Sequence, residues 1–331
     1  MFSIGDLISE QLYLKMKKLN ETAVDKIEGL VFFIKEYLEE QNKQNKDLSF
    51  PKYIVAAFGG KNENRIQNLY ELKQALSYKG YIAKITNTIP SAHGYENKIL
   101  GMYFGKLRVY DEEIQQEKNI DVYFTVEFGL AIAYTFQQQD ILVICPEIFF
   151  KSPHDINGVI YHEITHLTQP SKKLPRRYIQ SRTVNPRPGR VGLQDYFDYI
   201  RAKPEFEASM AGVIQSLRRN FRNLYNKAPN DQLWQRTKSI QLNKLKTLIE
   251  LDRKDVLREF SINYTEENRM PFDNSIIPYD EQILLQTVYF ASLGDEKTSS
   301  GNVGRLRWNQ LINGFKALYN ELSQSKDYAT K

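Results

Sequence analysis

The stretch that most constrains this chain is His162-Glu163-Ile164-Thr165-His166, which is typical of one amphipathic helix. Pro153 and Pro170 bracket the segment, and Asp155 is suited to cap its first turn. Two histidines four positions apart project from the same face of such a helix. Apolar residues recur around them at helical spacing, at Ile156, Val159, Ile160, Ile164 and Leu167.

The two histidines have the spacing of a metal site. Two imidazoles on adjacent turns can both reach a tetrahedral Zn²⁺ at roughly 2.0–2.1 Å. Glu163 lies about 100° further round the helix, so its carboxylate stays off the metal and faces the water that the metal holds. Such a carboxylate is placed to act as a general base on that water. The alternative interpretation is a helix with two surface histidines and a solvated glutamate.

This pattern resembles the zinc helix of the zincin metallopeptidases, whose subgroups differ in the third ligand. A metzincin would have Gly three residues after His166 and His three residues further on, where this chain has Gln169 and Lys172. That subgroup is therefore excluded. The segment Glu205-Phe206-Glu207-Ala208-Ser209 is similar to the ligand helix of the gluzincins, with Ser209 in place of an Asp that orients a zinc histidine in that subgroup.

The resemblance covers about residues 140–215 and implies that His162, His166 and Glu205 bind Zn²⁺. With Glu163 as base, it implies a zinc-dependent metalloendopeptidase that hydrolyses peptide bonds by Glu-assisted attack of a zinc-bound water. An edge strand before the zinc helix would then bind the protein or peptide substrate as an added strand. Four tyrosines are candidate donors to the oxyanion, and the sequence does not rank them: Tyr161, Tyr178, Tyr196 and Tyr199.

Two glutamates compete for the third ligand position. By helix geometry Glu207 lies about 70° from the centre of the apolar face and Glu205 about 130°, which favours Glu207 as the more buried carboxylate. However, the small residues Ala208, Ser209 and Gly212 lie on the side of Glu205 and leave room for the zinc helix. Because the resemblance also assigns the ligand to the first glutamate, we expect Glu205 to bind the metal. Glu207 would contact the basic loop or a zinc histidine.

The rest of the pattern predicts an α+β fold, with a small zincin-like mixed sheet, the zinc helix and the Glu helix, flanked by N- and C-terminal helical extensions. Three parts follow: an N-terminal helical extension at 1–47, a metallopeptidase core at 48–228 and a C-terminal helical region at 229–331. Strands are predicted at 53–58, 81–86, 99–110, 120–126 and 140–145, with 128–136 ambiguous. Further helices are predicted at 64–79, 231–260 and 280–293, and a flexible connection at 294–304.

Basic residues concentrate in one segment. Residues 171–258 contain 20 basic and 8 acidic residues, whereas the whole chain carries a net charge of +5. Residues 171–190 are typical of a long loop on the rim of a cleft. A solvated face would explain this charge, and so would an acidic or nucleic-acid partner.

Other classes of function therefore stay open. The basic segment supports the alternative of a nucleic-acid-recruited SprT-like protease. The large helical extensions suggest a structural or assembly protein, in a virion for example, that retains a zincin fold. A toxin or effector protease is a further alternative.

Composition bears on the compartment. The sequence has no run of 18 apolar residues, and its first ten residues hold Asp6 where a signal peptide has a basic region, so we expect no membrane partner and a cytoplasmic protein. The single Cys145 cannot form an internal disulfide. We interpret it as a small buried hydrophobe in the strand at 140–145 rather than a catalytic thiol.

Overall fold

The computed structural model describes most of the chain in two compact units. The first unit comprises the described parts of Met1–Lys151 and Val159–Arg187, and the second those of Ser152–Gly158 and Pro188–Lys331. Among the described residues, no helix is both long enough and apolar enough to cross a membrane. The described residues are 4–44, 48–60, 62–92, 94–111, 114–129, 131–168, 202–228, 230–256, 288–289, 291–292 and 299–324.

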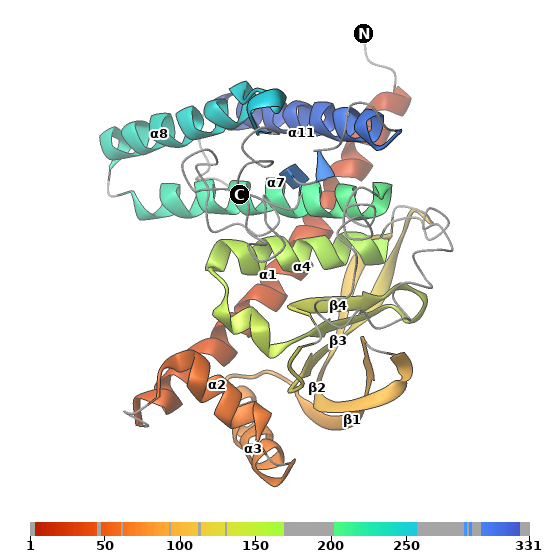
Figure 1. The fold of residues 1–331 in the computed structure, drawn as a ribbon, viewed down its shortest axis with the longest axis vertical. Helices are drawn as coiled ribbons and strands as arrows, with labels where there is room; N and C mark the ends of the chain where they lie inside the picture. Colours follow the sequence, from red (N-terminus) through yellow and green to blue (C-terminus); the bar gives the residue numbers. More distant parts are fainter. Residues whose placement is uncertain are drawn as a thin grey trace. The chain divides into compact units, whose positions relative to one another are not determined.

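A five-stranded mixed sheet forms the centre of the first unit (Figure 1). Its strand order is β1-β2-β3-β5-β4, with β4 at one edge of the described sheet. β1, β2 and β3 pair antiparallel, β5 runs parallel to β3, and β4 pairs antiparallel with β5. The strands are β1 (Lys84–Ser91), β2 (Gly94–Asp111), β3 (Gln116–Thr125), β4 (Ala133–Phe136) and β5 (Ile141–Ile144).

Most of the predicted strands are confirmed. The predictions at 99–110, 120–126 and 140–145 correspond to β2, β3 and β5, and the ambiguous stretch at 128–136 contains β4. The strand predicted at 81–86 starts later, at Lys84. A mixed α+β architecture is therefore confirmed, and the finer expectation of a zincin-like sheet stays a prediction.

Three helices belong with this sheet: α1 (Ile4–Gln44), α2 (Phe50–Gly59) and α3 (Asn62–Tyr78). The predicted helices at 1–47 and 64–79 are thus confirmed over the described residues. The side-chain amide of Asn20 in α1 donates to the Tyr110 carbonyl at 3.4 Å and accepts from the Tyr110 amide at 2.8 Å, which ties α1 to β2. The inner face of α1 is an apolar stripe of buried residues: Val24, Ile27, Val31, Ile34 and Leu38.

The prediction of a strand at 53–58 is wrong, because these residues form α2. Pro51 stands in the first turn of this helix, where its missing N–H costs nothing. Ile54, Ala57 and Phe58 are buried at a spacing of three and four residues, so the helical period satisfies the apolar run. A run of six apolar residues does not distinguish a buried strand from a buried helix, and packing against α3 decides here.

The second unit is helical. Its long helices are α7 (Lys203–Lys227), α8 (Asp231–Glu250) and α11 (Ser299–Gln324). Asn230 caps α8 by accepting a hydrogen bond from the Leu233 amide at 2.9 Å. Arg218 of α7 pairs with Glu321 of α11 at 2.6 Å. The three helices share an apolar core that includes Phe206, Val213, Leu217, Phe221, Trp234, Leu245, Leu248, Leu311, Phe315 and Leu318.

The C-terminal predictions hold in part. α8 confirms the helix at 231–260 as far as Glu250. The prediction of a flexible connection at 294–304 is wrong for its last residues, because α11 begins at Ser299. The residues of α11 that pack in the core of the second unit include Trp308, Leu311, Phe315, Leu318 and Leu322. Most of the helix predicted at 280–293 lies outside the described residues. The predicted boundaries at 47 and 228 stay predictions. Compactness groups α1 with the sheet and α7 with the later helices.

Two glycines make opposite predictions. A Cβ on Gly101 of β2 would overlap the Phe124 carbonyl oxygen, so Gly101→Ala must distort the β2–β3 pairing. We expect it to lower the free energy of unfolding by about 1–3 kcal/mol. A Cβ on Gly29 of α1 meets nothing within 4 Å, so Gly29→Ala should raise the free energy of unfolding by about 0.5–1 kcal/mol. Urea unfolding of both variants measures these free energies, and equal changes in the two variants would contradict the expectation.

Candidate metal centre

The helix that carries the two histidines is α4 (Pro153–Thr168). Ser152, not Asp155, caps it: the Asp155 amide donates to the Ser152 hydroxyl oxygen at 3.2 Å, and that hydroxyl donates to the Asp155 carboxylate at 3.1 Å. Ser152 thus caps the helix through the amide three residues later, and the Asp155 carboxylate orients the capping hydroxyl. The prediction of Asp155 as the cap is wrong by three positions, although the carboxylate still faces the positive end of the helix dipole.

His162 and His166 are buried side by side on α4. They are 7% and 4% exposed, their rings are nearly perpendicular, and their Nε2 atoms lie 3.0 Å apart. Two nitrogens bound to a tetrahedral zinc at 2.0–2.1 Å are separated by about 3.3 Å. The pair therefore fits a zinc ion with a shift of a few tenths of an ångström. The alternative of two surface histidines does not hold, because both rings are buried.

Glu163 lies beside this pair without joining it. Its Oε1 is 3.9 Å from Nε2 of His162, and its side chain is 12% exposed. That nitrogen is the atom that would face a metal. A carboxylate at this separation is too far for a direct hydrogen bond and near enough to act through one water.

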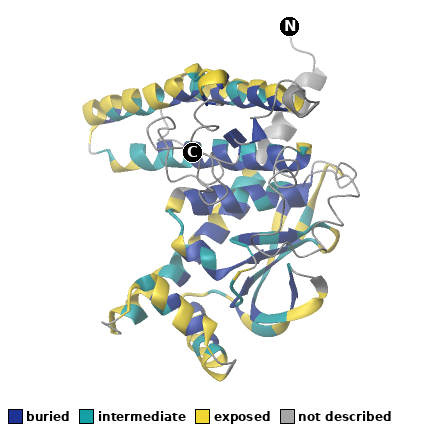
Figure 2. Cartoon of the chain, in the orientation of Figure 1, coloured by how far each residue is buried: buried dark blue, intermediate teal, exposed yellow. Residues whose placement is uncertain are grey.

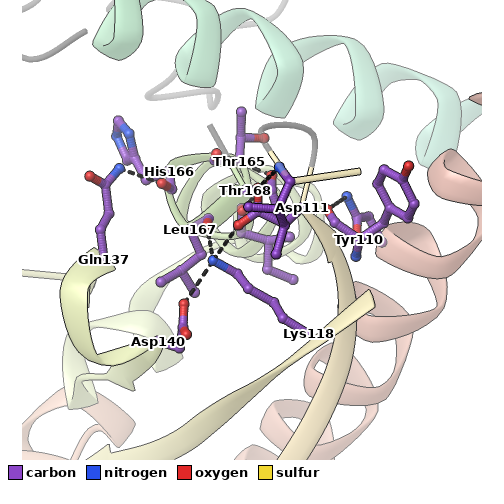
Figure 3. Close-up of polar contacts among 12 residues, drawn as sticks. Tyr110, Asp111, Lys118, Gln137, Asp140, Thr165, His166, Leu167 and Thr168 are labelled. Atoms are coloured by element: carbon purple, nitrogen blue, oxygen red, sulfur yellow. Dashed lines mark hydrogen bonds and ion pairs between the residues drawn. The ribbon is translucent and has the colours of Figure 1, made fainter. Parts of the chain in front are cut away.

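Side chains hold the C-terminal end of α4, where the last carbonyls lack partners within the helix (Figure 3). The Thr168 hydroxyl donates to the Thr165 carbonyl at 3.2 Å. The amide of Gln137 donates to the His166 carbonyl. The ammonium of Lys118 donates to the Leu167 carbonyl at 2.6 Å. The turn that carries His166 is therefore attached to the sheet of the same unit.

Lys118 is the centre of this arrangement. Its ammonium lies 2.7 Å from Asp111 at the end of β2 and 2.7 Å from Asp140 in the turn before β5. Burial alone would lower the pKa of Lys118, but hydrogen bonds to both carboxylates and their charges raise it above its ordinary value. Neither Lys118 nor Gln137 was predicted from the sequence, because no local spacing marks either residue as a neighbour of α4.

The strand at the described edge of the sheet is connected to this helix end. β4 ends at Phe136, and the next residue is the Gln137 that binds the His166 carbonyl. Asp140, in the left-handed conformation at φ 53°, then turns the chain into β5. An edge strand before α4 is therefore present among the described residues, and its role in binding a peptide stays a prediction.

The two competing glutamates lie in the second unit, in the first turns of α7. Glu205 is 7% exposed, whereas the side chain of Glu207 is 39% exposed and lies 3.5 Å from Lys203 of the same helix. The burial expected from helix geometry is thus reversed, because the small side with Ala208 and Ser209 is buried as fully as the apolar side. Figure 2 shows α7 as buried over much of its surface. Glu207 pairs with Lys203. The basic loop, one of its predicted partners, lies outside the described residues.

A buried arginine adjoins this turn within the second unit. The guanidinium of Arg307 in α11 lies 5.1 Å from the ring centroid of Phe206 and is 2.7 Å from the side chain of Gln310. Burial lowers the pKa of Arg307, and the charge of Glu207 raises it. Glu207 therefore balances a nearby cation, which is a sufficient structural role for a partly exposed carboxylate at this position.

The interpretation of Cys145 as a buried hydrophobe is confirmed. Its side chain is fully buried, and burial, followed by the charge of Glu147, raises the pKa of the thiol well above its usual range. The thiol stays protonated at neutral pH and is not an activated nucleophile.

Several predicted site features lie outside the described residues. Of the four candidate tyrosines, Tyr161 is described and is partly buried. The other three, Tyr178, Tyr196 and Tyr199, and the basic loop at 171–190 are outside.

Comparisons of this chain with protein-family models, with curated proteins and with solved structures found no match.

Proposed function

We propose that this chain is a zinc-dependent metalloendopeptidase of the gluzincin type. His162, His166 and Glu205 are the proposed ligands, and Glu163 is the proposed general base. One observation carries the proposal: two buried imidazole nitrogens lie 3.0 Å apart with the Glu163 carboxylate 3.9 Å from one of them. All three proposed ligands are buried, and they are the kinds of donor that hold zinc.

The donor set favours catalysis over a closed structural site. A structural zinc is held by four protein ligands, whereas a catalytic zinc has three and keeps a position open. The bound ion would polarise the scissile carbonyl and lower the pKa of the attacking water. Glu163 would take a proton from that water and return it to the leaving amine. Its neighbouring position on the same helix supports this role.

The edge strand supports a peptide as the substrate. β4 has β5 on one side and no described strand on the other, so its outer backbone groups can pair with an extended chain. The hydrogen bond from Gln137 to the His166 carbonyl links the end of β4 to the turn that carries a proposed ligand. A peptide added along β4 would therefore run beside the histidine pair.

The first prediction concerns metal content. The wild-type chain should retain about one Zn²⁺ after dialysis, and His166→Ala should lose it, because one remaining imidazole and a carboxylate do not hold zinc tightly. His93→Ala is the matched control, since it removes a histidine outside the motif. Mass spectrometry of the metal gives the stoichiometry. Stoichiometric zinc in His166→Ala would reject the ligand assignment.

The second prediction concerns the base. Glu163→Gln keeps the shape of the side chain and removes its basicity, so zinc content and melting temperature should match the wild type. Hydrolysis of a quenched fluorescent peptide library should fall by roughly 10²–10⁴-fold. Unchanged turnover would mean that Glu163 is not the base. A zinc-loaded wild type that cleaves no peptide in the library would favour the structural alternative.

The third prediction separates the two glutamates. Glu205→Ala should abolish tight zinc binding, because it removes the buried carboxylate. Glu207→Ala removes a partly exposed partner of Lys203 and should change zinc affinity by less than about threefold. Competition with a chromophoric chelator measures both affinities. If Glu207→Ala is the metal-free variant, the third ligand has been assigned two residues too early.

A further inference from the structure

We infer that Lys118 and Gln137 are positioning residues for the proposed metal site, because together they fix the last turn of α4 to the sheet. This inference rests on the proposed function. It concerns two residues that are not ligands and that lie on other elements of the first unit.

His166 lies two residues before the end of α4. A helix normally frays in this last turn, because the last carbonyls have no partners within the helix. A ligand in a fraying turn would have to be ordered when the metal binds, and that ordering costs affinity. Fixing the turn beforehand removes this cost.

The contacts in Figure 3 supply such fixation at consecutive carbonyls. Gln137 donates to the carbonyl of His166 itself, and Lys118 donates to the next carbonyl, that of Leu167, at 2.6 Å. The ammonium also stands at the negative end of the helix dipole, where a cation is favoured. Contacts of this kind hold the backbone of His166 in place and so restrict the position of its imidazole.

Lys118 is itself held in place. Its ammonium is 2.7 Å from both Asp111 and Asp140, and its side chain is 16% exposed. The two carboxylates orient a side chain that would otherwise have several rotatable bonds free. The position of the helix end is therefore set by β2, β3 and the turn after β4.

The test measures zinc affinity by chelator competition in four variants. Lys118→Met should weaken zinc binding by about 10–100-fold, and Gln137→Ala by about two- to tenfold. Lys106→Met, at an exposed lysine of β2, should leave affinity unchanged. Leu72→Ala, a core substitution in α3, should lower the melting temperature without changing affinity. The last control separates positioning from general loss of stability.

A second measurement covers a poorly folding Lys118 variant. Asp140→Asn keeps the left-handed turn, since Asn tolerates that conformation, and removes one charge from the Lys118 cluster. It should weaken zinc binding in the same direction by a smaller factor, and exchange of the backbone amides of residues 165–168 should become faster.

The outcomes distinguish the two proposals. A wild type without zinc overturns the proposed function. A wild type that binds zinc while Lys118→Met, Gln137→Ala and Asp140→Asn bind it equally well overturns the positioning role alone, even if all three melt earlier.

Discussion

The first unit depends on one partly buried ammonium. Lys118 joins the end of β2, the turn before β5 and the end of α4 by contacts of 2.6–2.7 Å. Removing a lysine from water is costly, and two carboxylates and a carbonyl together offset that cost. Such a cluster acts chiefly by making alternative packings unfavourable. Leaving one of its members unpaired would cost more free energy than the intact network contributes to stability. It therefore selects one position for the helix against the sheet.

The two ends of α4 are fixed by different means. At its start, the Ser152 hydroxyl accepts from the Asp155 amide and donates to the Asp155 carboxylate. At its end, side chains from β3 and from the turn after β4 satisfy the last carbonyls. The histidine pair lies between these two fixed points. The proposed site therefore lies on a helix whose two ends are both held, which orders its backbone before any ligand binds.

The two glutamates of α7 show how burial separates residues of the same type. Glu205 and Glu207 are two positions apart, and the apolar face alone favours the second as the buried one. The surroundings reverse this, because the small residues on the opposite side of α7 are also covered. Glu207 is left at the margin with Lys203 as its partner and Arg307 as a nearby charge. A polar face on a helical wheel is thus no guarantee of exposure when its residues are small.

By itself, the sequence determined the local features. The period of the apolar residues predicted α4, α1, α3 and α8, because neighbours along the chain encode the faces of a helix. The content of β-branched and aromatic residues predicted β2, β3 and β5. The i, i+4 spacing of His162 and His166 likewise determined that the two rings share one face. The sequence did not determine whether the short apolar run at 53–58 forms a helix or a strand, since either can bury these residues.

Only the tertiary structure decided the rest. Lys118 meets Leu167 across 49 residues of sequence, and no periodicity relates such a pair. The side chains that end α4, the burial of Glu205 and the turn of Asp140 into β5 all depend on elements that meet only after folding. The physical reason is that hydrogen bonds and desolvation act through space, whereas the pattern in a sequence records only which side of its own helix or strand each residue occupies.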